Sequence, residues 1–212
     1  MNENLTDINI VLDRSGSMGS IRTDMEGGLN SFIEDQKKVE GEATVTLYQF
    51  DHNFEKVFVA KAIEDVIGIE LNPSGMTALH DAIGMSIVKT GERLAAMDEK
   101  DRPSKVVFVI ITDGYENSSK EYTSEAVKAL IEQQEKTYSW EFVFLGANQD
   151  AVKEAANFGI SASKAMTYDF SSKGVGGASA GLSASMTSYR SVKDGKMEFS
   201  AEQKAAANED GA

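Results

Sequence analysis

The feature that most constrains the fold is the alternation of short, uniformly apolar runs with longer segments of helical periodicity. Runs in which nearly every residue is apolar are typical of strands that are covered on both faces, as in a parallel sheet. Three runs have this character, and each ends in a polar turn: Ile8–Leu12, Val106–Thr112 and Glu141–Leu145. We therefore expect a mostly parallel sheet with helices on both faces.

Two further runs predict one antiparallel strand at an edge of this sheet. Only residues 51–55 separate Thr44–Phe50 from Lys56–Lys61, a gap that permits a hairpin but no crossover helix. A short additional strand is expected at Ala165–Tyr168.

Apolar residues spaced by three and four predict the helices between these strands. The predicted segments are Thr23–Val39, Ala78–Met97, a helix begun by Thr123 or Ser124, a short helix between Asp150 and Gly159, and a last helix through Ala178–Tyr189. The glycine-rich residues 174–181 are interpreted as a small-residue helix start or joint, because no strong strand precedes them as a dinucleotide-binding loop requires. The predicted fold is a three-layer, doubly wound α/β domain over residues 1–190, followed by a polar C-terminal tail, 191–212.

Composition limits the partners and the chemistry. The 212 residues suffice for one α/β domain, and a net charge of −13 opposes binding to phosphate backbones and anionic lipid. We therefore expect neither nucleic acid nor a membrane as a partner. With no Cys and two His, the sequence excludes disulfides, thiol catalysis and Cys-ligated zinc. The first residues show neither a signal peptide nor a membrane span, so a cytoplasmic location is expected.

Acidic and hydroxyl side chains follow the ends of the predicted parallel strands. Asp13, Ser15 and Ser17 come directly after the first strand. Asp113 follows another buried strand, and Thr77 precedes the second helix. Because parallel strands end at one edge of a sheet, we expect these side chains to lie together. Such an all-oxygen set favours Mg²⁺, with Mn²⁺ or Ca²⁺ as alternatives. In a second interpretation, the same residues only cap helices and form turns.

Two other acidic residues near this edge have simpler interpretations. Asp51 lies in the FDHN turn of the predicted hairpin, with a role beside the metal as the alternative. Asp81 falls in the first turn of the second helix, where the helix dipole favours an acid.

The five residues at the predicted edge resemble those of the von Willebrand factor A (VWA) domain family. DxSxS at residues 13–17, Thr77 within GMTALHDA and Asp113 within ITDG follow the order of that family's metal-ion-dependent adhesion site (MIDAS). The resemblance is clear over residues 7–147. It implies hydroxyl ligands from Ser15, Ser17 and Thr77, while Asp13 and Asp113 act largely through bound waters. It also implies a Rossmann-like fold and a stand-alone intracellular domain of bacterial or phage type.

The function implied by the resemblance is a non-enzymatic module whose metal ion bridges to an Asp or Glu side chain of a protein partner. The partner is expected to contact a rim formed by Arg14, Met18, Tyr115 and Glu116. A Mg²⁺-dependent hydrolase or phosphotransferase is one alternative, although no Walker-type loop or placed general base is found. The other is a structural or assembly protein whose metal only stiffens the loop and whose tail after Ser191 makes the contacts. The oligomeric state is left open.

Overall fold

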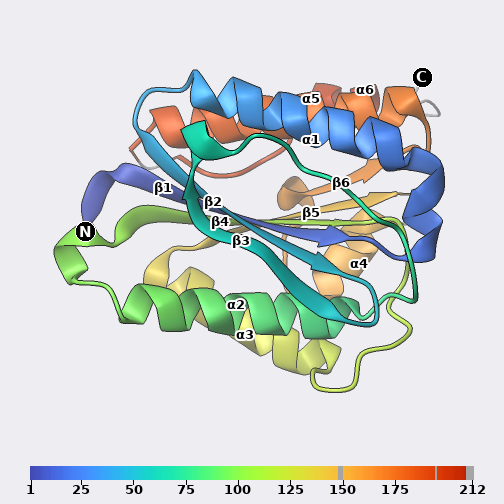
Figure 1. The fold of residues 1–212 in the computed structure, drawn as a ribbon, viewed down its shortest axis with the longest axis horizontal. Helices are drawn as coiled ribbons and strands as arrows, with labels where there is room; N and C mark the ends of the chain where they lie inside the picture. Colours follow the sequence, from blue (N-terminus) through green and yellow to red (C-terminus); the bar gives the residue numbers. More distant parts are fainter. Residues whose placement is uncertain (148–149, 194, 209–212) are drawn as a thin grey trace.

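The apolar runs of the sequence form the centre of one six-stranded sheet (Figure 1). The computed structural model describes residues 1–147, 150–193 and 195–208. Within them the strands are β1 (Asn2–Asp13), β2 (Glu42–Phe50), β3 (Phe54–Ala62), β4 (Pro103–Thr112), β5 (Glu141–Ala147) and β6 (Ala165–Tyr168). Their order is β3-β2-β1-β4-β5-β6; β3 pairs antiparallel with β2, and all the other neighbours are parallel. The predicted sheet with one antiparallel edge strand is confirmed.

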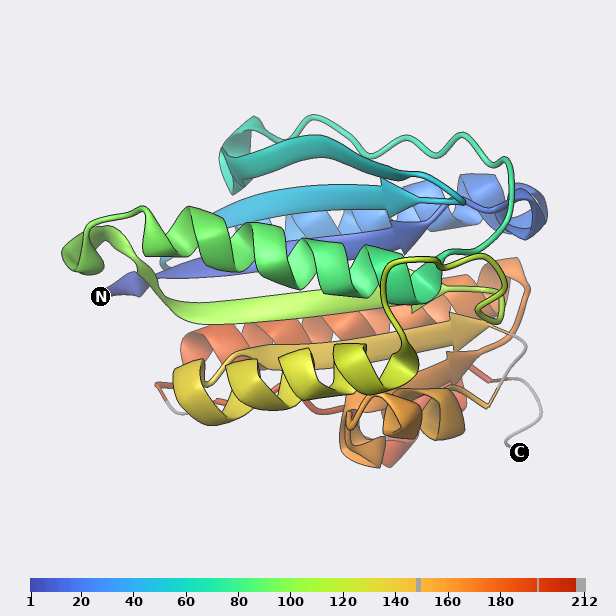
Figure 2. The ribbon, with the colours of Figure 1, turned by 90° about the horizontal axis from the view of Figure 1, so that it is seen from below.

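Helices cover both faces of the sheet (Figure 2). One face carries α1 (Arg22–Lys37), α5 (Ser172–Ser191) and the short α6 (Ala201–Ala206). The other carries α2 (Leu79–Ala95), α3 (Ser124–Tyr138) and α4 (Ala151–Asn157). Short 3₁₀ helices lie between these elements at η1 (Gly16–Ile21), η2 (Ile63–Asp65), η3 (Glu99–Asp101) and η4 (Ala162–Lys164). The predicted three-layer α/β fold is therefore confirmed.

The two cores follow from the two-residue period of the central strands. Val107, Val109 and Ile111 of β4 belong to the core under α1 and α5, whereas Phe108 and Ile110 belong to the core under α2 and α3. Successive side chains of a strand point to opposite faces, so a strand covered on both faces must be apolar throughout. This is why the uniformly apolar runs identify the central strands.

The strand order reverses its direction between β1 and β4, which makes their carboxyl ends a topological switch point. These two strands are neighbours, yet the chain continues from β1 toward β2 on one side and from β4 toward β5 on the other. The connections after the two strands therefore diverge, which leaves room between them for a ligand. The residues that follow β1 and β4 lie at this switch point.

Small residues bring α1 and α5 close together. A Cβ atom on Gly28 of α1 would lie 2.2 Å from Oγ of Ser179 on α5, so the side chain of Ser179 occupies the space that Gly28 leaves. The glycine-rich residues 174–181 lie within α5, and the Ser171 hydroxyl caps this helix by accepting a hydrogen bond from the Gly174 amide at 3.1 Å. The structure agrees with the small-residue helix that the sequence favours over a dinucleotide-binding loop.

The segment expected to be a polar tail packs onto the domain over its described residues. Met197 and Phe199 are buried in the core under α1 and α5, and Ala207 joins them. Ser200 and Gln203 form a capping box that starts α6. The described part of the predicted polar tail is therefore packed against the domain through its two large apolar side chains. The boundary at residue 190 stays a prediction.

No helix in the described part of the chain is long and apolar enough to cross a membrane.

Candidate metal site

Asp13 ties the loop after β1 to the neighbouring strand β4. Its Oδ1 atom accepts a hydrogen bond from the Ser15 amide at 2.6 Å, and its Oδ2 atom accepts one from the Thr112 hydroxyl at 2.6 Å. The Asp13 side chain is fully buried. A carboxylate at the end of β1 thus orients the loop that carries the two serines.

The hydroxyl groups of that loop lie against Asp113 at the end of β4. The Oγ atoms of Ser15 and Ser17 are 3.1 Å apart, and Ser17 donates a hydrogen bond to Oδ1 of Asp113 at 2.8 Å. A Cβ atom on Gly114 would lie 3.4 Å from Oγ1 of Thr77 and 4.0 Å from Oγ of Ser17, so Thr77 lies beside the same group. The structure brings Asp13 and these four residues together at the carboxyl edge.

The loop that carries Thr77 is positioned by backbone hydrogen bonds. The carbonyl of Gly75 accepts from the Gly16 amide at 3.2 Å, and the Ser74 amide donates to the Arg14 carbonyl at 2.8 Å. Gly75 has φ +71°, in the left-handed region that favours glycine. The loop that carries Thr77 therefore packs directly against the loop that follows β1. These hydrogen bonds position Thr77 without using its side chain.

Asp81 holds the loop after β4, a role that the helix-dipole interpretation missed. Its carboxylate accepts from three consecutive backbone amides, those of Lys120 at 2.8 Å, Glu121 at 2.9 Å and Tyr122 at 2.8 Å. The first turn of α2 is thereby fixed to the loop that begins at Asp113. No local sequence pattern marks this contact, since its partners are backbone groups about forty residues away.

Asp51 lies behind the loop that carries Thr77. Its Oδ2 atom accepts from the Ser74 hydroxyl at 3.1 Å, its Oδ1 atom accepts from the Asn53 amide at 2.6 Å, and Arg14 pairs with it at 3.3 Å. Burial acts to raise the pKa of Asp51, but these hydrogen bonds and the Arg14 charge outweigh it and lower the pKa. Asp51 is a turn residue that also braces the loop.

Two of the four residues predicted to form the partner-binding rim do not face outward. Met18 is 0% exposed and packs into the core, so its side chain offers nothing to a partner. Glu116 points inward and accepts hydrogen bonds from the backbone amides of His80, Ser118 and Ser119. These two expectations are corrected, because the sequence shows adjacency to the site but not the direction of a side chain.

Of the other two predicted rim residues, Arg14 is paired with acidic residues and Tyr115 is exposed. Arg14 is largely buried and is paired with Asp51 and Glu55. Tyr115 is 61% exposed beside Asp113, and Met76, which the sequence analysis did not single out, is 56% exposed beside Thr77. The exposed side chains beside the five-residue cluster are thus Tyr115 and Met76, in place of the charged Arg14 and Glu116 that the sequence predicted.

Burial shapes the electrostatics of the two carboxylates. Burial raises the pKa of Asp13 to about 6, against the hydrogen bonds from Thr112 and Ser15, and the charge of Asp113 raises it further. Burial likewise raises the pKa of Asp113. Both shifts mean that the ionised forms are disfavoured in their surroundings, and a nearby cation would offset that cost.

The donor set fits a hard divalent cation. Oxygen atoms that share one octahedral Mg²⁺ lie about 3 Å apart, because Mg–O bonds measure about 2.0–2.1 Å. The Oγ atoms of Ser15 and Ser17 are 3.1 Å apart, which matches that spacing. The described residues contain no group of three or more His, Cys, Asp and Glu that would hold a metal ion, so the hydroxyls are essential members of this donor set.

The fold and the site lead to a family assignment. A family model described as the von Willebrand factor type A domain matches residues 7–173, which is most of the chain. The chain belongs to this family. VWA domains are typically metal-dependent protein-interaction modules and bind a divalent metal at the MIDAS. A comparison with curated protein sequences finds no match.

Solved structures share the VWA fold at low sequence identity. Proximal thread matrix protein 1 from the mussel byssus is 18% identical, with 87% of this chain and 46% of that chain covered and a TM-score of 0.61. Another structure of that protein, with a zinc-occupied MIDAS motif, is 19% identical over 79% of this chain and 42% of that chain, with a TM-score of 0.54. A von Willebrand factor type A protein from Catenulispora acidiphila is 17% identical over 88% and 43% of the two chains, with a TM-score of 0.56. This chain spans less than half the length of each.

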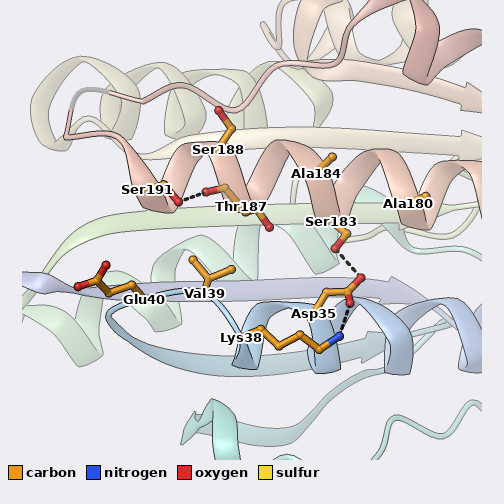
Figure 3. Close-up of a pocket in the computed structure, with 10 residues that line it drawn as sticks. All are labelled: Asp35, Lys38, Val39, Glu40, Ala180, Ser183, Ala184, Thr187, Ser188 and Ser191. Carbon is orange, nitrogen blue, oxygen red and sulfur yellow. Dashed lines mark hydrogen bonds and ion pairs between the residues drawn. The ribbon is translucent and has the colours of Figure 1, made fainter.

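A groove of about 820 Å³ lies away from the carboxyl edge, between the C-terminal parts of α1 and α5 (Figure 3). Inside it, Asp35 pairs with Lys38 at 2.9 Å and accepts a hydrogen bond from Ser183 at 3.0 Å. None of the five residues of the candidate metal site lines this groove.

Proposed function

We propose that this VWA domain is a metal-dependent protein-binding module whose cation bridges to an acidic side chain of the partner. Ser15, Ser17 and Thr77 would bind the ion through their hydroxyl oxygens, and Asp13 and Asp113 through bound waters. The observation that carries the proposal is the convergence of three hydroxyls and two carboxylates at one edge of the sheet. When bound, the cation supplies an electrophilic centre that accepts one further oxygen ligand.

Mg²⁺ is the proposed ion, with Mn²⁺ as the nearest alternative. The 3.1 Å spacing between the hydroxyl oxygens of Ser15 and Ser17 is shorter than the edge of about 3.3–3.7 Å that Ca–O bonds of 2.3–2.6 Å would set in an octahedral arrangement. Hard oxygen donors without thiolate or imidazole also favour Mg²⁺ over zinc.

The proposed partner is a protein that presents Asp or Glu beside an apolar side chain. Because the three direct donors are neutral, the cation would keep most of its charge and attract an incoming carboxylate. Tyr115 and Met76, exposed beside Asp113 and Thr77, offer apolar contacts around that carboxylate. The net charge of −13 disfavours nucleic acid and anionic membranes as partners. A sequence without cysteine is consistent with the proposed cytoplasmic location.

The surroundings of Arg14 favour binding over phosphoryl chemistry. A phosphotransferase needs a cationic side chain that can contact the phosphate. Arg14 is the basic residue nearest to the cluster in sequence, and Asp51 and Glu55 already pair with it. The proposed module is accordingly non-enzymatic.

Affinity capture from a lysate of the native source tests the bridging mechanism. Wild-type protein is compared in Mg²⁺ and in EDTA, beside Ser17→Ala and its matched control Ser20→Ala, an exposed serine of the same turn outside the cluster. We expect a partner that is retained by wild type and Ser20→Ala in Mg²⁺, and lost with EDTA or with Ser17→Ala. A partner retained equally under all four conditions would contradict bridging through the metal.

A further inference from the structure

Tyr168 ends β6 at the same edge of the sheet as the metal site. Tyr168 pairs with Ala147 of β5, and in the next pair along β5, Gly146 lies opposite Thr112 of β4. Tyr168 therefore sits level with Asp113, two strands away, which is about 10 Å at the usual strand spacing. Its side chain is fully buried in the core that also contains Met18 of the turn after β1.

The hydroxyl of Tyr168 has no hydrogen-bond partner among the described residues. Buried tyrosine hydroxyls usually find a partner, since an unpaired polar group in the interior loses its bonds to water. Tyr48, the other large fully buried tyrosine, follows that rule, because its hydroxyl lies 3.1 Å from the Thr90 hydroxyl. The surroundings of Tyr168 must therefore explain why its hydroxyl is unpaired.

The electric field of the metal site reaches this hydroxyl. Burial raises the pKa of Tyr168 strongly, and the charges of Asp113 and Asp13 raise it further. The phenol consequently keeps its proton throughout the physiological range. A protonated, unpaired donor that experiences the charges of two carboxylates is suited to hold a negative group in place.

We propose that Tyr168 is a positioning residue of the metal site. Its hydroxyl donates a hydrogen bond to a water molecule that also binds the Asp113 carboxylate when the site holds its cation. The inference rests on the proposed metal binding, and it adds a residue from a third strand to a cluster drawn from the ends of β1 and β4 and the loop before α2. With the cation bound, Tyr168 would hold the Asp113 carboxylate in its position through this water.

The replacement Tyr168→Phe tests this role because it removes one oxygen atom and keeps the buried ring. If the Tyr168 hydroxyl contributes only to packing in the core, its removal leaves the affinity for Mg²⁺ unchanged. If it positions Asp113, the dissociation constant for Mg²⁺ rises by about 10-fold, the lower end of the effect of removing a partner of a metal ligand. In EDTA the melting temperature should stay the same or rise, since no protein hydrogen bond is lost.

The experiment is a Mg²⁺ titration of wild type, Tyr168→Phe and the control Tyr48→Phe, followed by calorimetry and by melting temperature. Tyr48→Phe loses a hydrogen bond in the other core, so it should melt lower in EDTA and bind Mg²⁺ like wild type. Weaker Mg²⁺ binding by Tyr168→Phe alone supports the inference. Equal binding by all three proteins overturns it and leaves the metal site standing. No response of wild type to Mg²⁺ overturns both the metal site and this inference.

Discussion

Gly75 shows how one residue without a side chain holds the metal-site loops together. Its φ of +71° costs an L-residue with a Cβ atom about 1–2 kcal/mol. A Cβ atom there would also lie 2.2 Å from Nδ1 of His52, an exposed side chain that can move aside. The backbone conformation is therefore the main reason for glycine at this position.

We predict that Gly75→Ala lowers the free energy of unfolding by about 1–2 kcal/mol and weakens Mg²⁺ binding. Gly91→Ala is the matched control, because a Cβ atom at Gly91 of α2 meets nothing within 4 Å. This control should gain up to about 1 kcal/mol from the better helix propensity of alanine. Urea denaturation measures both, and equal stability of the two variants would refute the conformational argument.

Glu116 makes stability depend on pH in a defined direction. Burial acts to raise its pKa, but hydrogen bonds from the amides of Ser119, His80 and Ser118 outweigh burial and bring the pKa below the ordinary 4.5. A carboxyl group with a lowered pKa in the folded state stabilises the fold above its unfolded pKa. That contribution is lost as the pH falls through the folded pKa.

We therefore predict that Glu116→Gln loses about 2 kcal/mol of stability at pH 7, because an ionised acceptor is replaced by a neutral one. The difference in stability between variant and wild type should narrow as the pH falls from the ordinary pKa of 4.5 through the lower pKa of the folded state. Thermal melts from pH 3 to 7 provide the measurement. A gap that stays constant over this range would show that the charge of Glu116 is not what anchors the loop.

The residues that could be predicted from sequence are those tied to strand ends. Asp13 ends β1, Ser15 and Ser17 follow it, and Asp113 follows β4, so the parallel topology alone brings them to one edge. Asp81 could not be assigned its role, because it binds backbone amides distant in the chain, and such partners leave no mark on the sequence.

At the scale of elements, the alternation of apolar strands and periodic helices suffices to predict the sheet and its helical layers. The segment after α5 is the exception. Met197 and Phe199 alternate there with Lys196 and Glu198, a two-residue pattern too short to be distinguished from a polar tail. Its packing depends on space beside α5 that only the folded structure reveals.

We predict that Phe199→Ala lowers the free energy of unfolding by about 3 kcal/mol, since Phe199 is buried in the core under α1 and α5. Val192→Ala, at an exposed position just after α5, should change it by less than about 0.5 kcal/mol. Chemical denaturation compares the two. If Phe199→Ala is as stable as Val192→Ala, the segment 191–208 contributes no stability and behaves as a tail.

At the scale of the whole molecule, the fold leaves the carboxyl edge of the sheet as the natural binding surface. Helices cover both faces, and the connections after β1 and β4 diverge above the metal cluster (Figure 1). The net charge of −13 makes a cation at this edge favourable and would draw it there from solution. Under the proposed function, binding of a partner carboxylate to so acidic a protein would depend on the ion between the two.

Calorimetric titration of chelator-treated protein with Mg²⁺ shows whether the cluster at this edge binds one divalent cation. We expect wild type and Ser20→Ala to bind one ion per chain. Ser17→Ala should bind about 10-fold more weakly or not at all, because Ser17 lies between Ser15 and Asp113 in the cluster. Absence of binding to wild type, or equal binding to Ser17→Ala, would contradict the assignment of the site.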